Sequence, residues 1–155
     1  MNIHIALQNP SNAPIPSITQ LQSWVENAVA TVSAAFSPEQ QHMTLRIVDE
    51  EESARLNEQY RHKTGPTNIL SFTDDPIPGF HSDSLGELVI CATLVVKEAQ
   101  AQGKQIDCHW AHLIVHGVLH LAGHDHEADE AATIMENLEI RILTNLGYDD
   151  PYSAG

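Results

Sequence analysis

The stretch DCHWAHLIVHGVLHLAGHDH, residues 107–126, combines a helix, a helix stop and a group of histidines. Asp107 can cap the helix at its N-terminus. Gly123 can end it, because glycine readily adopts the left-handed conformation that follows many helices. The aliphatic residues between these two ends are expected to supply much of the protein core.

Strands and helices are interleaved on the N-terminal side of this stretch, and one more helix follows it. We predict strands at residues 2–8, 43–49, 68–73 and 85–90 from their alternating or continuous apolar residues. We predict helices after the caps Ser17 and Asp49, across residues 91–103, and from about residue 129 to Gly147. Residues 74–84, DDPIPGFHSDS, are expected to form an exposed loop. This order predicts a single domain over residues 1–155 with an α/β (α+β) fold, one mixed sheet of about four strands and about five helices.

Composition limits the possible functions. The 155 residues are 42% apolar and only 5% aromatic, as expected for one domain with an aliphatic core. The N-terminus resembles no signal peptide and no apolar run could span a membrane, so we expect a cytoplasmic protein. Cys91 and Cys108 are far apart in sequence and are expected to be small buried residues. The net charge of -14 opposes tight nonspecific binding of nucleic acid.

Three histidines at ligand spacing predict a metal site. His116 and His120 are one helical turn apart, so two imidazole nitrogens can face one ion. The turn at Gly123 can bring back His126 as the third ligand, and His124 is the alternative. Three neutral imidazoles suit one Zn2+ ion with an open position for water, although nickel or another divalent ion would also fit.

The other histidines and Asp125 are expected to have supporting roles. His124 and Asp125 can orient a ligand ring or handle a proton. His109 and His112 extend the same helical face upstream. They are predicted to be hydrogen-bonded packing residues, because a helix rises about 5.4 Å per turn and one ion cannot span four turns.

The spacing of these histidines is also that of the metzincin peptidases, which read H-E-x-x-H-x-x-G-x-x-H. Here Gly117 stands where the catalytic glutamate would be. Peptide hydrolysis by that mechanism is therefore disfavoured. A residue without a side chain could also open space beside the metal for a bulkier substrate.

Four segments together resemble the YbeY family of metal-dependent endoribonucleases, also called rRNA maturation factors. HGVLHLAGHDH is similar to the family's H-G-x-L-H-L-x-G-Y-D-H, with His124 where tyrosine is usual. LNEQYRHKTGPTNILSF resembles the family's L-N-x-x-Y-R-x-K-D-x-P-T-[DN]-V-L-S-F, with Thr64 where aspartate is common. LGELVI and LGYDDPY resemble two further family segments, so the resemblance runs from residue 49 to residue 152.

The resemblance implies a metalloproteinase-like fold and a zinc ion held by His116, His120 and His126. It implies single-strand-specific cleavage of RNA, in maturation of the 3′ end of small-subunit rRNA and in ribosome quality control. It also assigns the family's functional arginine to Arg61.

Arg61 and Lys63 belong to the one local basic cluster of the sequence, at the end of a predicted helix. They can complement the helix dipole, or they can bind substrate phosphate, with the Arg61 guanidinium neutralising transition-state charge. In the second case His116, His120 and Arg61 are catalytic, and zinc-activated water attacks the phosphodiester. Attack by the ribose 2′-hydroxyl is the alternative route.

The charge of the chain suggests that a partner delivers the RNA. We expect ribosomal proteins or ribosome-associated assembly factors to dock on acidic segments such as EADE and YDDPY, while single-stranded rRNA is the substrate. Two other functions remain open at this point. One is a noncatalytic zinc-containing ribosome assembly factor, and the other is a metallopeptidase or amidase that lacks the usual glutamate base.

Overall fold

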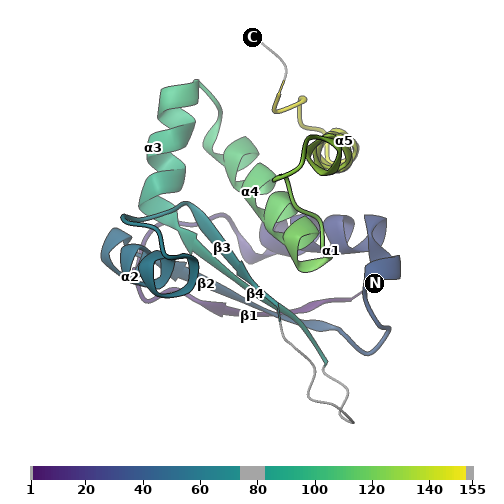
Figure 1. Cartoon of the computed structure of the whole chain (residues 1–155), viewed down its shortest axis with the longest axis horizontal. Helices are drawn as coiled ribbons and strands as arrows, with labels where there is room; N and C mark the ends of the chain where they lie inside the picture. The colour runs from purple at the N-terminus through teal and green to yellow at the C-terminus, as the bar shows by residue number, and fades with distance from the viewer. Residues whose placement is uncertain (1, 74–82, 153–155) are drawn as a thin grey trace.

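A computed structural model describes residues 2–73 and 83–152. Within these ranges the chain forms four strands and five α-helices around one open sheet (Figure 1), which confirms the predicted α+β fold. The elements are β1 (His4–Gln8), α1 (Ile18–Thr31), a short 3-10 helix (Ser33–Ala35), β2 (His42–Val48), α2 (Glu50–Arg61), β3 (Ile69–Phe72), β4 (Ser84–Cys91), α3 (Ala92–Gln102), α4 (Ile106–Leu121) and α5 (Asp129–Asn145). Most of the predicted loop at residues 74–84 lies outside the described residues. No helix in the described ranges has the length and apolarity needed to cross a bilayer.

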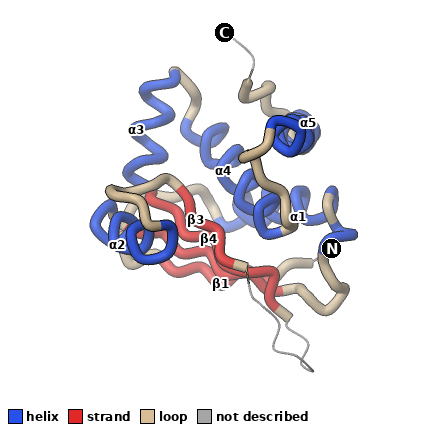
Figure 2. The backbone as a smooth tube through the Cα atoms, viewed as in Figure 1, coloured by secondary structure: helices blue, strands red, loops and turns tan. Residues whose placement is uncertain are grey.

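The sheet is mixed, with strand order β1-β2-β4-β3. β1, β2 and β4 are parallel, and β3 runs antiparallel to β4 at the edge of the sheet. Parallel neighbours need a crossover between them, and α1 supplies one between β1 and β2. The short strand β3 forms one edge of the sheet and lies beside α4 (Figure 2). α4 carries the predicted site residues His116 and His120.

The two faces of the sheet bury different side chains. Leu88 and Ile90 of β4 belong to the large core with α1, α4 and α5. Val89, between them, packs in a small cluster with Leu70 and with Leu56 of α2. Because side chains alternate along a strand, α2 covers the face opposite α1 and α4. α4 is thus enclosed between the sheet and the other helices, and most of its residues are buried.

Most predicted helix ends agree with the structure, but one does not. The Ser17 side chain accepts a hydrogen bond from the Gln20 backbone N–H, and Asp49 accepts one from Glu52, so both predicted caps are confirmed. The prediction that Asp107 caps α4 is wrong, since the helix begins at Ile106 after Gln105. Asp107 lies in the first turn, where its carboxylate accepts a hydrogen bond from the Gln20 amide at 3.2 Å. A contact with α1 has replaced the local capping role.

Gly117 serves helix–sheet packing. A Cβ atom at this position would lie 2.8 Å from Ile69 Cδ1 and 2.8 Å from Leu88 Cδ2, closer than real contacts allow. Glycine therefore lets α4 lie directly on β3 and β4. The expectation that Gly117 opens space beside the metal is wrong, because side chains of the sheet fill that space.

Candidate metal centre

The structure brings together the three histidines that the sequence predicts as metal ligands. One nitrogen from each of His116, His120 and His126 lies within 4.8 Å of the other two. The Nε2 atoms of His116 and His120 are 3.0 Å apart. A tetrahedral zinc ion with bonds of about 2.0–2.1 Å would hold its nitrogens roughly 3.3 Å apart. The donor set therefore fits a zinc ion once the nitrogen separations, which are at most 4.8 Å, adjust to this value.

The turn after α4 brings His126 back to the helix. Gly123 adopts a φ of 97°, in the left-handed region. Its N–H donates to the carbonyl of His120 at 3.0 Å, and the N–H of His124 donates to the carbonyl of Leu119 at 3.0 Å. These two bonds form the glycine-terminated helix end that the sequence predicts. The reversed chain then places His126 against the histidine pair of α4.

A buried glutamate from α5 holds the ring of His116. Glu139 is only 1% exposed, and its carboxylate accepts hydrogen bonds from His116 Nδ1 at 2.9 Å, His112 Nε2 at 3.1 Å and the Tyr152 hydroxyl at 2.6 Å. Burial raises the pKa of Glu139, but these three hydrogen bonds outweigh it and lower the pKa to about 2. With its Nδ1 proton directed at Glu139, His116 presents the lone pair of Nε2 to the cluster.

The surroundings of His120 and Tyr152 fix their protonation states. Burial, followed by the nearby His116 and His126, lowers the pKa of His120 to about 4, so its ring is neutral at pH 7 and able to bind a metal. A hydrogen bond with the backbone of His124 also engages the His120 ring. Burial, followed by the hydrogen bond to Glu139, raises the pKa of Tyr152, which stays a hydrogen-bond donor.

Sequence analysis did not find Glu139 or the Tyr152 hydroxyl. A signal for Glu139 exists in α5, where Met135, Glu139, Ile142 and Leu143 are the buried residues and share one helical face. Glutamate is almost never fully buried without a partner, so its place in an apolar stripe indicates a specific interaction. Tyr152 has no comparable local signal, because its hydroxyl reaches Glu139 from the LGYDDPY segment, whose resemblance to the family indicated no contact for this residue.

His109 and His112 are packing residues, as predicted. His109 Nε2 contacts Glu98 at 2.9 Å, and His112 contacts Glu139. Burial is the main cause that lowers the pKa of His109. Neither ring belongs to the group of three potential metal ligands found in the described residues.

His124 and Asp125 contribute to the turn that carries His126. The Asp125 carboxylate accepts a hydrogen bond from the backbone N–H of Glu127 at 3.2 Å. The carboxylate that contacts a ring of the cluster is Glu139. A role of the His124 and Asp125 side chains in proton handling stays a prediction.

Arg61 is anchored at the edge of the sheet beside α4. Its Nη2 donates to the carbonyl of Ser71 at 2.7 Å, and its guanidinium carbon lies 5.5 Å from the centre of the Phe72 ring. The Ser71 hydroxyl in turn contacts the carbonyl of Gly117 at 3.4 Å. Arg61 is thus held close to the histidine helix, while Lys63 is exposed two residues further along.

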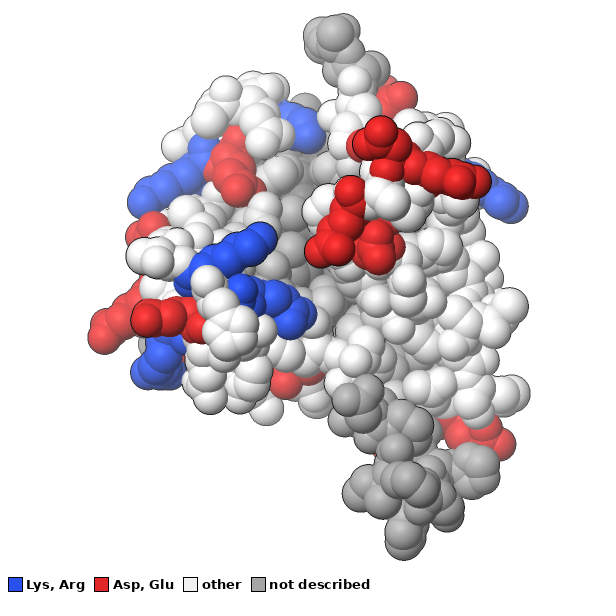
Figure 3. Space-filling view, viewed as in Figure 1, with Lys and Arg blue, Asp and Glu red and all other residues white. Residues whose placement is uncertain are grey.

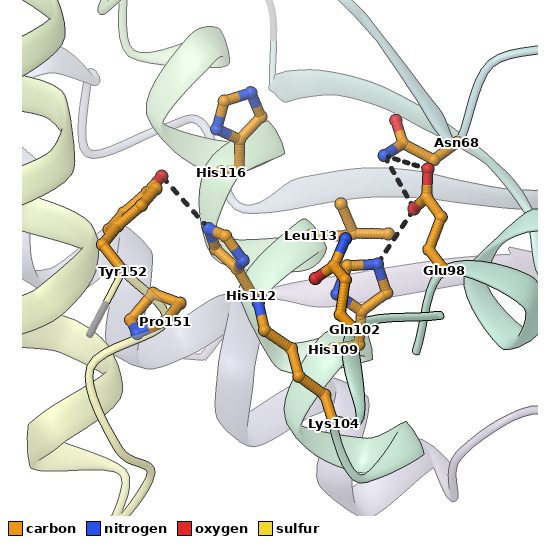
Figure 4. Close-up of a pocket in the computed structure, with 10 residues that line it drawn as sticks. All are labelled: Asn68, Glu98, Gln102, Lys104, His109, His112, Leu113, His116, Pro151 and Tyr152. Atoms are coloured by element: carbon orange, nitrogen blue, oxygen red, sulfur yellow. Dashed lines mark hydrogen bonds and ion pairs between the residues drawn. The ribbon is translucent and has the colours of Figure 1, made fainter. Parts of the chain in front are cut away.

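Two cavities meet at the histidine cluster. The larger one, about 370 Å³, lies between α3, α4 and the C-terminal segment (Figure 4). The smaller one, about 170 Å³, lies against α5. His116 and Tyr152 line both cavities. The cavities therefore meet at His116, and the smaller one also reaches His126.

Charges are distributed unevenly around this region. Figure 3 shows most of the visible lysines and arginines, together with several acidic side chains, on the side of α2 and α3, further acidic side chains on the side of α5, and a hollow between them. Of the seven lysines and arginines, five lie in α2, in α3 or within two residues of their ends: Arg55, Arg61, Lys63, Lys97 and Lys104. Most lysines and arginines of the strongly negative chain are therefore concentrated in and near α2 and α3, where Glu50, Glu51, Glu52, Glu58 and Glu98 lie among them.

Comparisons with known proteins agree with the sequence resemblance. The family model described as endoribonuclease YbeY matches residues 6–147. A Coxiella burnetii protein named endoribonuclease YbeY is 53% identical over 138 residues, covering 89% of this chain and 90% of its own length. A Methylococcus capsulatus protein of the same name is 47% identical over 150 residues, covering 97% and 95%. The solution structure of a Thermotoga maritima protein covers 98% of this chain and 99% of its own, with a TM-score of 0.57 and 23% identity, which supports the fold.

Proposed function

This chain belongs to the YbeY endoribonuclease family, and from that premise we propose that it is a zinc-dependent endoribonuclease that cleaves single-stranded RNA. The observation that carries the proposal is the cluster of His116, His120 and His126 at the meeting point of two cavities. A cluster with access to substrate is what hydrolysis at a metal requires.

The donor set supports a catalytic metal over a structural one. Structural zinc sites are usually closed by four protein ligands, whereas catalytic sites use three and keep one position open. Within residues 2–73 and 83–152, no fourth histidine, cysteine, aspartate or glutamate joins the cluster. A divalent metal in such a site lowers the pKa of a bound water toward neutrality and withdraws charge from a phosphate oxygen.

The residues around the cluster orient the ligands and bind the substrate. Glu139 fixes the ring and the tautomer of His116, and Tyr152 fixes one oxygen of Glu139. Arg61 uses one N–H on Ser71, so other N–H groups of its guanidinium remain available for a phosphate oxygen. Its fixed position near α4 supports the proposal that Arg61 neutralises charge on the scissile phosphate, with the exposed Lys63 as a second cation.

RNA is a better substrate for this site than a peptide. Metzincins need a glutamate directly after the first histidine, and here that position is Gly117, which packs against the sheet. Arg61 and Lys63, next to each other at the end of α2, also provide local cations for a polyanion, despite the net charge of -14.

We extend the proposal to ribosome assembly. Family membership supports roles in maturation of the 3′ end of small-subunit rRNA and in ribosome quality control. A basic ribosomal protein would dock on the acidic side, which includes residues 127–130 at the start of α5. Salt-sensitive association with ribosomal particles, lost when Glu127, Asp129 and Glu130 are replaced by glutamine or asparagine, is the expected result in a pull-down experiment.

Metal content and RNA cleavage, measured on the same samples, test the catalytic proposal. Wild type should hold one metal per chain and cut single-stranded RNA but not a duplex of the same sequence, whereas His120→Ala should lose both metal and cleavage. His4→Ala is the matched control, because it removes an exposed histidine of β1 that lies outside the cluster and should keep both properties. A metal-loaded wild type without cleavage would favour the noncatalytic assembly factor. A 2′,3′-cyclic phosphate at the product end would replace water attack with attack by the 2′-hydroxyl.

A further inference from the structure

The larger cavity extends away from the histidine cluster along α4. It is lined by His109, His112 and His116 of α4 and by Glu98 and Gln102 of α3. His109 and His116 are seven residues apart, so the cavity runs for about 10 Å along the helix. Its volume of about 370 Å³ lies at the small end of the range for ligand pockets. His116, one of the three candidate metal ligands, lies at only one end of this space.

Aromatic rings line the end of the cavity near the cluster. The rings of His112 and Tyr152 are 5.5 Å apart and nearly perpendicular, at 86°. Tyr152 is 47% exposed although its hydroxyl is bound to Glu139, so much of its ring remains accessible. Figure 4 shows Tyr152 and Pro151 on one side of the hollow and the α3 side chains on the other. Single-stranded RNA is commonly recognised by stacking an unpaired base on such rings.

Polar groups suited to the edge of a base line the opposite side. The Glu98 carboxylate is fixed by hydrogen bonds from His109 Nε2 at 2.9 Å and from Asn68 Nδ2 at 3.0 Å. Its side chain is still 33% exposed, and a carboxylate can accept about four hydrogen bonds. The exposed amide of Gln102 lies one helical turn further along the same face of α3. Lys104 also lines the cavity, where its ammonium group could contact a neighbouring phosphate.

We propose that this cavity binds the base of a nucleotide next to the scissile phosphate and selects bases that carry an exocyclic amino group. The proposal rests on the proposed endoribonuclease function. Glu98 would accept a hydrogen bond from the amino group, Gln102 would pair with the adjacent ring atoms, and Tyr152 would contact the face of the base. Cytosine, adenine and guanine have such an amino group. Uracil offers only one N–H, flanked by two carbonyl oxygens. The Glu98 carboxylate repels these oxygens, so uracil should bind less well.

Cleavage of single-stranded RNA oligomers that differ at one position beside a mapped cut site tests the selection. Wild type should prefer cytosine over uracil by roughly tenfold in kcat/KM, the lower range for one hydrogen bond to a charged group. Glu98→Gln should reduce the preference to about twofold, because an amide can present either a donor or an acceptor to the base. Glu51→Gln is the matched control, since it removes an exposed carboxylate outside both cavities and should keep the full preference.

Two additions keep the result clear. Gln102→Ala changes an exposed side chain at the end of α3, so it should weaken the preference without affecting folding, even if Glu98→Gln unfolds. Cytidine and uridine 5′-monophosphate, titrated separately into the full chain, should shift NMR signals of α3 and α4 more strongly for cytidine. Cleavage with equal rates at cytosine and uracil would overturn the base pocket but keep the nuclease. Absence of cleavage would overturn the proposed function. The nucleotide titration would then test the base pocket by itself. Equal shifts with both nucleotides, or no shifts, would overturn the pocket.

Discussion

Replacing Glu139 by glutamine should weaken both the fold and the metal site. The carboxylate is the common acceptor for three donors, from His112, His116 and Tyr152. A glutamine of the same shape would present an N–H₂ group to at least one of these donors. The substitution therefore leaves a buried donor unsatisfied and removes the charge that orients His116.

The expected loss of stability follows from the pKa of Glu139. Its pKa is lowered from 4.5 to about 2 in the folded protein. One pKa unit corresponds to about 1.4 kcal/mol, so the ionised group is stabilised by about 3 kcal/mol relative to the unfolded chain. Glu139 is 1% exposed, so solvent screening reduces this value little. We expect Glu139→Gln to lower the free energy of unfolding by about 3 kcal/mol at pH 7.

Urea unfolding of the chelator-treated protein measures the loss of stability, and competition with a chelator of known affinity measures zinc binding. Zinc affinity should fall by about 10- to 100-fold, as for other carboxylates that orient a metal-binding histidine. Glu130→Gln, at an exposed position in the first turn of α5, should change stability by less than about 1 kcal/mol. If Glu139→Gln matched this control in both assays, the inferred role of the buried carboxylate would be refuted.

Three further changes have expected outcomes. Arg61→Ala should keep its zinc, measured by metal analysis, but its rate of RNA cleavage should fall by about 100-fold or more. A variant with full activity would contradict the proposed role of Arg61 at the phosphate. Gly117→Ala should lower the free energy of unfolding by about 1–3 kcal/mol in urea, because its Cβ must displace Leu88 and Ile69; an unchanged midpoint would show that α4 can move away from the sheet. The metal-free protein should lose stability on acidification. Because the pKa of His120 falls to about 4 in the fold, the unfolded chain takes up a proton first between pH 6.5 and 4. Below about pH 4.5 the unfolded chain also protonates the carboxylate of Glu139 before the folded state does. Urea midpoints that stay constant from pH 7.5 to pH 5 would contradict this sign.

Local patterns in the sequence predicted the elements and the three histidines well. Caps and stops such as Ser17, Asp49 and Gly123 act through bonds to residues a few positions away, so their effect can be inferred from sequence. The spacing of His116 and His120 is equally local. These predictions succeeded because the physical interactions involved lie within one or two helical turns.

The errors involve contacts between distant segments. Asp107 has the chemistry of a cap, but Gln20, 87 positions away, binds its side chain. Gly117 is explained only by the sheet residues beneath it. Glu139 reaches His116 across 23 positions, and no spacing rule connects α5 with α4. The tertiary fold decided each of these roles.

The concentration of cations in and near α2 and α3 has a kinetic consequence. A net charge of -14 by itself would slow the approach of RNA, and added salt would then accelerate association by screening the repulsion. Arg61, Lys63 and Lys104 instead lie in or next to α2 and α3, and if their local field dominates, the strand is attracted to that side of the molecule. Encounters would then succeed mainly from that direction, and added salt should slow association with a short single strand. Stopped-flow measurements at increasing ionic strength would distinguish the two cases. An association rate that rises with salt would mean that repulsion by the net charge dominates, and a rate that falls would mean that attraction by the local cations dominates.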